Sequence, residues 1–294
     1  MLRDKKPFHF IKLRKIWYGI SIVFLVPAII SIFAQGFNLG IDFTGGSMME
    51  VRFSQHTAVE DVRGVMAEFG MGSDPIQRSD VNDFIIRTRE LEEEESNAIL
   101  LAMGEKIGEV ELLRNERVGP KIGQELILNA FMAFGFASIL IMLYITWRFE
   151  LKQGIATVVS LLHDAILVLG IFSLLQLEVD SKFVAAILII IGYSLNDRIV
   201  IFDRIRENLI YRKRGEDLAE VINNSIWQTM ARSINTGLTM LFVVGALFVL
   251  GGSTLQNMTL AILVGLTIGI YSSLSNASPL WYDLRRMEGK AGTR

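Results

Sequence analysis

Residues 233–282 read SINTGLTMLFVVGALFVLGGSTLQNMTLAILVGLTIGIYSSLSNASPLWY, fifty consecutive residues without a Lys, Arg, Asp or Glu. A membrane-spanning helix needs about 20 apolar residues, because the hydrocarbon core of a bilayer is about 30 Å thick. The stretch therefore has room for two spans, and Gly251-Gly252-Ser253 is typical of the turn between them. A soluble core has no need of such a run, so these residues predict a membrane protein.

The rest of the chain contains four further apolar runs. The first, residues 16–34, follows a basic segment, a layout that also occurs in cleaved signal peptides. Ala34-Gln35-Gly36 is a poor cleavage site, so we expect an uncleaved span. The six expected spans are residues 16–34, 125–147, 154–177, 183–202, 233–250 and 257–282.

The loops between these runs differ in positive charge. Eighteen Lys and Arg residues lie on one side, in segments 1–15, 203–232 and 283–294 and in the loop after the second span. The two short loops on the other side contain one, Lys182. Positive residues accumulate on the cytoplasmic side of membrane proteins. Both termini are therefore expected in the cytoplasm, and residues 35–124 outside it.

Residues 36–124 form a water-soluble insert, with 9 basic and 17 acidic residues and no long apolar run. The pattern predicts the order β-α-β-β-α-β of an α+β, ferredoxin-like domain. Within it, His56 is expected to be a solvated surface histidine. The acids Glu92–Glu95 are expected to be a solvated helix start, with a surface for a basic partner as the alternative. The expected strands are 48–53, 75–79, 83–88 and 109–118, and the expected helices are 57–70 and 91–107.

Composition excludes several kinds of function. The net charge of −2 gives no basic surplus for binding nucleic acid. The absence of cysteine excludes disulfides and thiolate metal sites. No metal-ligating or nucleophilic constellation is evident, so neither a metal site nor a catalytic residue is expected.

Charges inside the spans are the candidates for function. Asp164 lies about 15 Å beyond Gly154 at 1.5 Å per residue, and a carboxylate at the bilayer centre costs about 2.5–3.5 kcal/mol. Asn196, Asp197 and Arg198 interrupt the fourth span at a similar depth. A buried carboxylate beside an arginine can change its protonation when the arginine moves, so the group predicts proton transfer. His163 is expected about 100° around the helix from Asp164, facing a different helix.

Two plainer interpretations stay open for these residues. In the first interpretation, Asp164 and the neighbouring Asp197 and Arg198 form a static ion pair. In the second, the fourth span ends early, at Leu195. The composition alone indicates a membrane protein with an intramembrane carboxylate and an unknown cargo.

Several motifs resemble those of a known family. They are Gly40-Ile-Asp-Phe-Thr-Gly-Gly46, the VGPKIG run at 118–123, His163-Asp164, the run GYSLNDRIVIFDRIREN at 192–208, and Arg232-Ser-Ile-Asn-Thr236. Together they resemble the SecF branch of the SecD/SecF family of bacterial protein-export proteins. The first motif also occurs in SecD, which carries a longer outside region, so the chain length favours SecF.

The resemblance implies a fold and a function. SecF pairs with SecD in a twelve-span unit of the RND transporter superfamily, which associates with the SecYEG channel and YajC in the bacterial cytoplasmic membrane. It is thought to use the proton gradient, or sodium in some bacteria, to promote preprotein export. It has no ATPase activity, so no enzyme and no cofactor beyond the coupling ion is expected.

The resemblance also assigns roles to residues. Asp164 matches the family's proton-carrying Asp, and Asn196, Asp197 and Arg198 match its partners on the fourth span. The chain departs from the commoner form of the family at Asn276, where that form has an apolar residue.

Other motifs have structural interpretations. Gly45 and Gly46 permit positive φ at a bend, with Asp42 and Thr44 expected to cap backbone N–H groups. Gly40 and Gly192 belong to the same structural set. A direct role of the glycine motif in coupling the domain to the membrane is the alternative.

Two further segments have expected packing roles. The spacing Gly265-x-x-x-Gly269 favours close helix packing. Residues 203–232 are expected to form an amphipathic helix at the cytoplasmic interface. Within them, Arg212-Lys213-Arg214 is interpreted as a topology anchor, with anionic-lipid binding as the alternative.

Two other functions remain as alternatives. In the first alternative, the chain is half of an RND-type exporter of small molecules or lipids, although an insert of this size leaves little room for a substrate pocket. In the other it is an assembly factor whose intramembrane charges lock helices together. The fifty charge-free residues are expected to contain little of the chemistry.

Overall fold

The computed structural model describes residues 8–212 and 215–291. The chain divides into two compact units, Met1–Asn38 with Met132–Arg294, and Leu39–Phe131. Residues 1–7 of the basic N-terminal segment, positions 213 and 214 of the expected topology anchor, and the last three residues of the tail lie outside the described residues.

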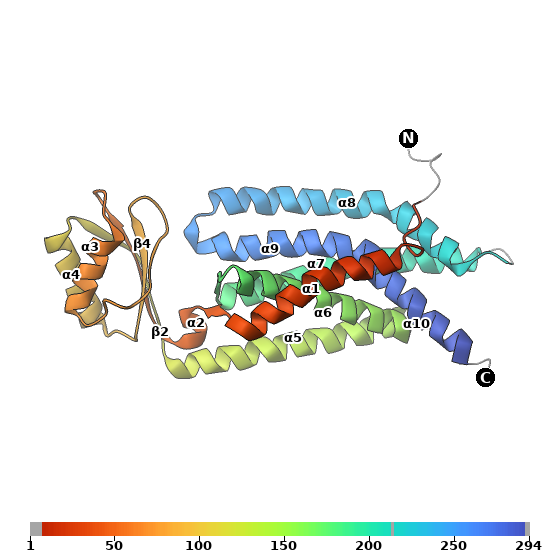
Figure 1. Cartoon of the computed structure of the whole chain (residues 1–294), viewed down its shortest axis with the longest axis horizontal. Coiled ribbons are helices and arrows are strands. Elements are labelled where there is room, and N and C mark those ends of the chain that lie inside the picture. The colour runs from red at the N-terminus through yellow and green to blue at the C-terminus, as the bar shows by residue number, and fades with distance from the viewer. Residues whose placement is uncertain (1–7, 213–214, 292–294) are drawn as a thin grey trace. The chain divides into compact units, whose positions relative to one another are not determined.

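Six apolar helices in the described residues are long enough to cross a membrane. At 1.5 Å per residue, the 22 residues of the first give about 33 Å, the thickness of the hydrocarbon core. Each expected span overlaps one of them, which confirms the prediction of six apolar helices, although the third expected span, 154–177, extends three residues beyond the end of its helix at Leu174. They are α1 (Arg14–Gln35), α5 (Pro120–Arg148), α6 (Leu151–Leu174), α7 (Ser181–Ile210), α8 (Leu218–Leu250), and a last helix made of α9 (Ser253–Ser272), η1 (Ser273–Ala277) and α10 (Ser278–Ala291) (Figure 1).

Local sequence explains where several helices begin. The carboxylate of Asp180 accepts from the backbone N–H of Phe183 at 2.8 Å and caps α7. Asp217 caps α8 in the same way, through the N–H of Ala219 at 3.2 Å. Gly252, with φ of 76°, turns the chain from α8 into α9. Two short strands, β1 (Asn38–Leu39) and β6 (Glu178–Val179), lie in connections.

Helix α6 is the most buried of the six and packs on α1, α7, α9 and α10. Small residues set how closely it approaches α1. A Cβ added at Gly170 would lie 2.1 Å from the Cβ of Ala28. The same rule applies where α9 meets α7, since a Cβ at Gly265 would lie 2.3 Å from the Cδ1 of Ile190. The Gly-x-x-x-Gly spacing therefore serves packing inside this chain.

Two helices are longer than expected. Helix α7 runs to Ile210, so the fourth span does not end at Leu195. The expected amphipathic helix over 203–232 is wrong, because residues 203–210 end α7 and a connection follows, whereas residues 218–232 are continuous with the fifth span in α8. Ile222 and Ile226 of its first turns are buried in a cluster with Ile11, Phe202 and Trp281. The amphipathic pattern therefore reflects packing against protein.

The second unit is an α+β fold. Its sheet has the order β3-β4-β2-β5 with every pair antiparallel, the pairing of a split βαβ arrangement. Both helices pack on one face of the sheet, over a core that includes Met49, Val51, Phe53, Val62 and Ile99. The elements are α2 (Ile41–Thr44), β2 (Gly46–Phe53), α3 (Val59–Glu68), β3 (Ile76–Arg78), β4 (Asp83–Thr88), α4 (Glu93–Lys106) and β5 (Val110–Val118).

The glycine motif forms the entry into β2. Gly45 and Gly46 have φ of 75° and 125°, as expected. Gly40 precedes α2 with extended backbone, and Asp42 lies in the first turn of α2. The expected capping by Thr44 is wrong, because its hydroxyl donates to the carbonyl oxygen of Gly40 at 3.1 Å instead of accepting from an N–H.

Candidate functional site

The structure brings Asp164 of α6 and Arg198 of α7 into direct contact. The Nη2 of Arg198 donates to the Oδ2 of Asp164 at 2.6 Å. The two residues are 1% and 0% exposed. The helices are antiparallel neighbours joined by a short connection, so residues at equal depth meet. An ion pair thus lies at the centre of the helical unit.

Serine hydroxyls surround this ion pair. The Nη2 of Arg198 also reaches the Oγ of Ser160 on α6 and of Ser272 at the end of α9, both at 2.9 Å. The hydroxyl of Ser272 donates in turn to the Oδ2 of Asp164 at 2.8 Å. Because burying two charges costs more than their attraction alone returns, such added hydrogen bonds are needed to stabilise the pair.

His163 joins the same cluster. Its Nδ1 lies 3.0 Å from the Oδ1 of Asp164, so the 100° between the two positions on the helix does not keep the side chains apart, although His163 also faces η1, as expected of a different helix. The imidazole lies along the helix surface toward the carboxylate, while its Nε2 lies 3.4 Å from the Nδ2 of Asn276 in η1. Each oxygen of Asp164 therefore has its own nitrogen partner.

Asp197 is held by a different set of groups. Its carboxylate accepts hydrogen bonds from the hydroxyls of Ser233 on α8 and Ser273 on η1. Since Ser272 bonds to Asp164 and Ser273 to Asp197, two consecutive residues contact the two acidic side chains. The start of η1 therefore links both carboxylates.

Asn196 is not brought to the cluster. It is exposed and lies two positions before the buried Arg198, about 200° around α7. Gly192 lies on the same exposed face, and a Cβ added there would meet nothing within 4 Å. Of the four candidate relay residues, two are in direct contact, Asp197 lies on an adjoining serine pair, and Asn196 lies on the outer face.

Sequence reasoning missed the contribution of the charge-free stretch. Ser233, Ser272 and Ser273 lie in it and donate hydrogen bonds to the two carboxylates, and Asn276 contacts His163, so this stretch supplies polar partners that were not expected of it. The signal was the polar run SSLSN at 272–276 inside an apolar helix. The five-residue π-helix η1 coincides with that run, and π-bulges are frequent at functional sites.

The candidate features of the second unit are simpler. His56 is exposed, and within the described residues no group of three or more His, Asp or Glu side chains gathers where it could hold a metal ion. Arg117 of β5 donates to Glu90 and, through both Nη atoms, to Glu92, each at 2.8 Å. These hydrogen bonds hold the pKa of Glu92 below its usual range. Arg117 therefore balances part of the negative charge at the start of α4.

Comparison with known proteins gives a consistent family. Residues 99–287 match the family model "Protein export membrane protein SecD/SecF, C-terminal", and residues 30–55 match the "SecD/SecF GG Motif". The chain is 41% identical over 282 residues to the protein translocase subunit SecF of Sebaldella termitidis, covering 94% of this chain and 92% of that protein. It is 39% identical to the protein translocase subunit SecDF of Bacillus subtilis, covering 94% of this chain and 38% of that protein.

A solved structure agrees in fold. The crystal structure of SecDF from Thermus thermophilus, described as a translocon-associated membrane protein, superposes with a TM-score of 0.89 at 36% identity. The match covers 97% of this chain, which spans 40% of the SecDF chain. With a family model matched over most of its length and relatives of this identity, the chain belongs to the SecD/SecF family of protein-export membrane proteins.

Proposed function

We propose that this chain is an auxiliary subunit of the Sec protein translocase that acts with SecD and uses the proton gradient to promote preprotein export. The relatives named above as translocase subunits support the export role. The observation that carries the coupling is the buried pair of Asp164 and Arg198. An ionisable pair inside a membrane is costly, and such groups mark ion pathways.

Protonation of Asp164 is the switching event. The ionised carboxylate attracts Arg198, whose Nη2 bonds to three acceptors. A proton on Asp164 cancels that attraction, and the favoured arrangement of α6, α7 and η1 then changes. The proton is the better coupling ion than sodium, because the guanidinium already occupies the cation position at the carboxylate.

The exposed face of α7 supports pairing with SecD. Ala185, Gly192 and Asn196 are exposed at helical spacing along it. Small residues let membrane helices approach closely, and an amide facing hydrocarbon needs a polar partner. A helix of SecD at this face satisfies both requirements, and the SecDF relatives unite the two names in one chain.

The membrane orientation follows from the charges of the loops. The chain lies in the bacterial cytoplasmic membrane with both termini in the cytoplasm, because the basic loops are on their side. Residues 35–124 are then outside, where an emerging preprotein meets them, and the assembly includes the SecYEG channel and YajC.

Reconstituted vesicles containing SecYEG, SecD and this chain test the proposal. We expect D164N to co-purify with SecD and to lose the stimulation of export by an imposed proton gradient. D203N is the matched control. Asp203 lies on α7, like Arg198, but it is partly exposed and pairs with Arg148 at the end of α5. Gradient-dependent stimulation that survives in D164N contradicts proton coupling at this site. Co-purification with a drug-efflux partner in place of SecD favours the exporter alternative.

A further inference from the structure

A chain of polar side chains leads away from Asp164 toward α1. His163 contacts Asp164 through Nδ1 and Asn276 through Nε2. The Nδ2 of Asn276 donates to the Oγ of Ser21 on α1 at 2.9 Å, and that Oγ lies 3.4 Å from the Oη of Tyr271 on α9. His163, Asn276 and Ser21 are all buried. The proposed relay does not use this branch.

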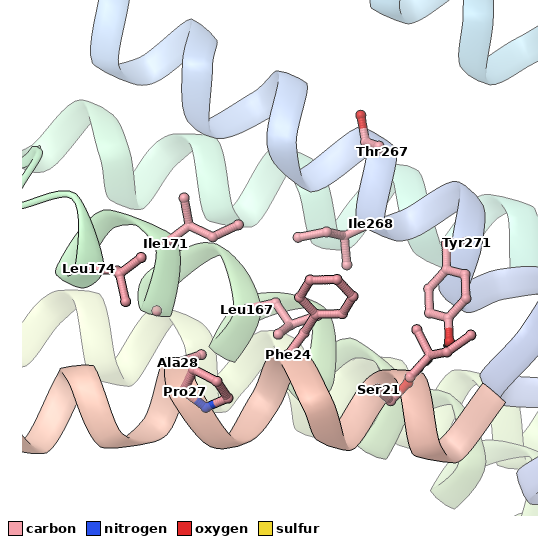
Figure 2. Close-up of a pocket in the computed structure, with 12 residues that line it drawn as sticks. Ser21, Phe24, Pro27, Ala28, Leu167, Ile171, Leu174, Thr267, Ile268 and Tyr271 are labelled. Atoms are coloured by element: carbon pink, nitrogen blue, oxygen red, sulfur yellow. Dashed lines mark hydrogen bonds between the residues drawn. The ribbon is translucent and has the colours of Figure 1, made fainter. Parts of the chain in front are cut away.

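The branch ends at the wall of a groove. Ser21 and Tyr271 line a hollow of about 360 Å³ between α1, α6 and α9, whose other lining side chains are almost all apolar. Figure 2 shows the Tyr271 hydroxyl directed toward Ser21 at one end of this groove. The hydroxyl also donates to the backbone carbonyl of Trp17 at 3.0 Å. Polar groups thus run from the buried carboxylate to Ser21 and Tyr271 at one end of this apolar groove.

The hydrogen-bonding groups around His163 favour one tautomer of the neutral ring. Asn276 presents its amide nitrogen, a donor only, to Nε2, so Nε2 accepts and carries no proton. The proton of the neutral ring is therefore on Nδ1 and is donated to Asp164. The Oδ1 of Asn276 has no hydrogen-bond partner among the described residues. Because the amide O and NH₂ are nearly equal in size, a half-turn of the amide changes its hydrogen bonding and hardly its packing.

We propose that His163 is a second proton-binding residue of the relay and that Asn276 is the positioning residue that follows its protonation. An incoming proton binds at Nε2, and the ring becomes an imidazolium. The amide of Asn276 turns so that its Oδ1 accepts from Nε2–H and from the hydroxyl of Ser21. The ring returns to neutrality by passing its Nδ1 proton to Asp164.

The charges of the cluster couple this step to movement. Asp164 and Arg198 are its charged groups, while η1 contributes Asn276 and α1 contributes Ser21. A proton on His163 adds a positive charge to a neutral pair and thereby weakens the hold of Asp164 on Arg198. The inference rests on the proposed function, since it supplies the proton that neutralises Asp164.

Nitrogen NMR of the intact chain in lipid nanodiscs tests the protonation states. The chain has three histidines, His9, His56 and His163, so H163Q assigns the resonances. We expect neutral His163 to be the Nδ1–H tautomer and to become an imidazolium when the sample is acidified. N276D, which places a carboxylate at Nε2, should preserve the imidazolium to higher pH. An Nε2–H tautomer, or no titration, overturns the proposal.

S275A is the matched control for Asn276, because the Ser275 hydroxyl donates to the backbone carbonyl of Tyr271. It should leave the His163 titration unchanged, and a shift as large as that of N276D counts against a specific role of the amide.

Export measurements separate the two proposals. If D164N abolishes gradient-dependent stimulation and H163Q preserves it at the level of H56Q, the inference fails and the function stands. If D164N preserves it, the proposed function fails.

Discussion

The Nη2 of Arg198 lies 2.6 Å from the Oδ2 of Asp164, and neither residue is more than 1% exposed. The two side chains come from α6 and α7, and Ser272 joins them from the end of α9. One ion pair therefore ties three helices together at the depth where charge is most costly. It is both a structural joint and the candidate switch.

Removing one partner of this pair should destabilise the helical unit. R198M leaves Asp164 buried without its cation, and breaking a buried pair in this way costs about 3–5 kcal/mol. The double variant D164L/R198M removes both charges at similar volume, so we expect it to recover most of that loss. Thermal unfolding in nanodiscs measures both, and a double variant no more stable than R198M contradicts this account of the pair.

Two glycines of the spans should respond oppositely to the same substitution. In G170A the new Cβ lies 2.1 Å from the Cβ and 2.6 Å from the Cα of Ala28, so α1 must move away from α6. Such overpacking costs about 1–3 kcal/mol. In G192A the Cβ meets nothing within 4 Å, and better helix propensity stabilises by up to about 1 kcal/mol. Unfolding midpoints of the chain without SecD check the contrast, and equal shifts would mean that close approach at Gly170 is unimportant.

The sequence predicted the parts of the fold that depend on solvent. Apolar runs must cross the bilayer and charged loops must stay in water, so the six apolar helices follow from counting residues. The alternation in the insert gave strand 83–88 with the bounds of β4. These features are local in the chain, and each is set by a few neighbouring residues.

Helix rotation and irregular backbone were beyond that reasoning. Whether Asp164 meets Arg198 or Asn196 depends on how α7 is turned against its neighbours, which packing of the whole bundle decides. The π-helix at Ser273–Ala277 depends on tertiary contacts, so the serines and Asn276 were not recognised as partners of the charges. The conformation of the His163 side chain could not be read from the 100° spacing of backbone positions either.

Gly46 should be the least replaceable glycine of the α+β unit. Its φ is 125°, and an added Cβ would lie 2.4 Å from the backbone oxygen of Thr88 on the paired strand β4. G46A therefore combines backbone strain, about 1–3 kcal/mol, with a clash that parts β2 from β4. G70A is the control, because Gly70 has φ of 76° but open space around its Cβ position. Amide hydrogen exchange in β2 and β4 should rise in G46A and much less in G70A, and the reverse order would exclude the clash.

The Arg117 pair should make the α+β unit sensitive to acid. Hydrogen bonds from Arg117 hold the pKa of Glu92 below its ordinary value of 4.5 when the unit is folded. A group whose pKa is lower in the folded state stabilises that state above its unfolded pKa, and the stabilisation disappears as the pH falls through the folded value. The contribution is therefore complete near neutral pH and decreases below pH 4.5.

E92Q removes this contribution at every pH, whereas E93Q, one residue further on, keeps the Arg117 pair. Amide exchange in β5 should be faster in E92Q than in wild type near neutral pH, and the two should converge in acid. Equal exchange at neutral pH would show that the pair does not stabilise the fold.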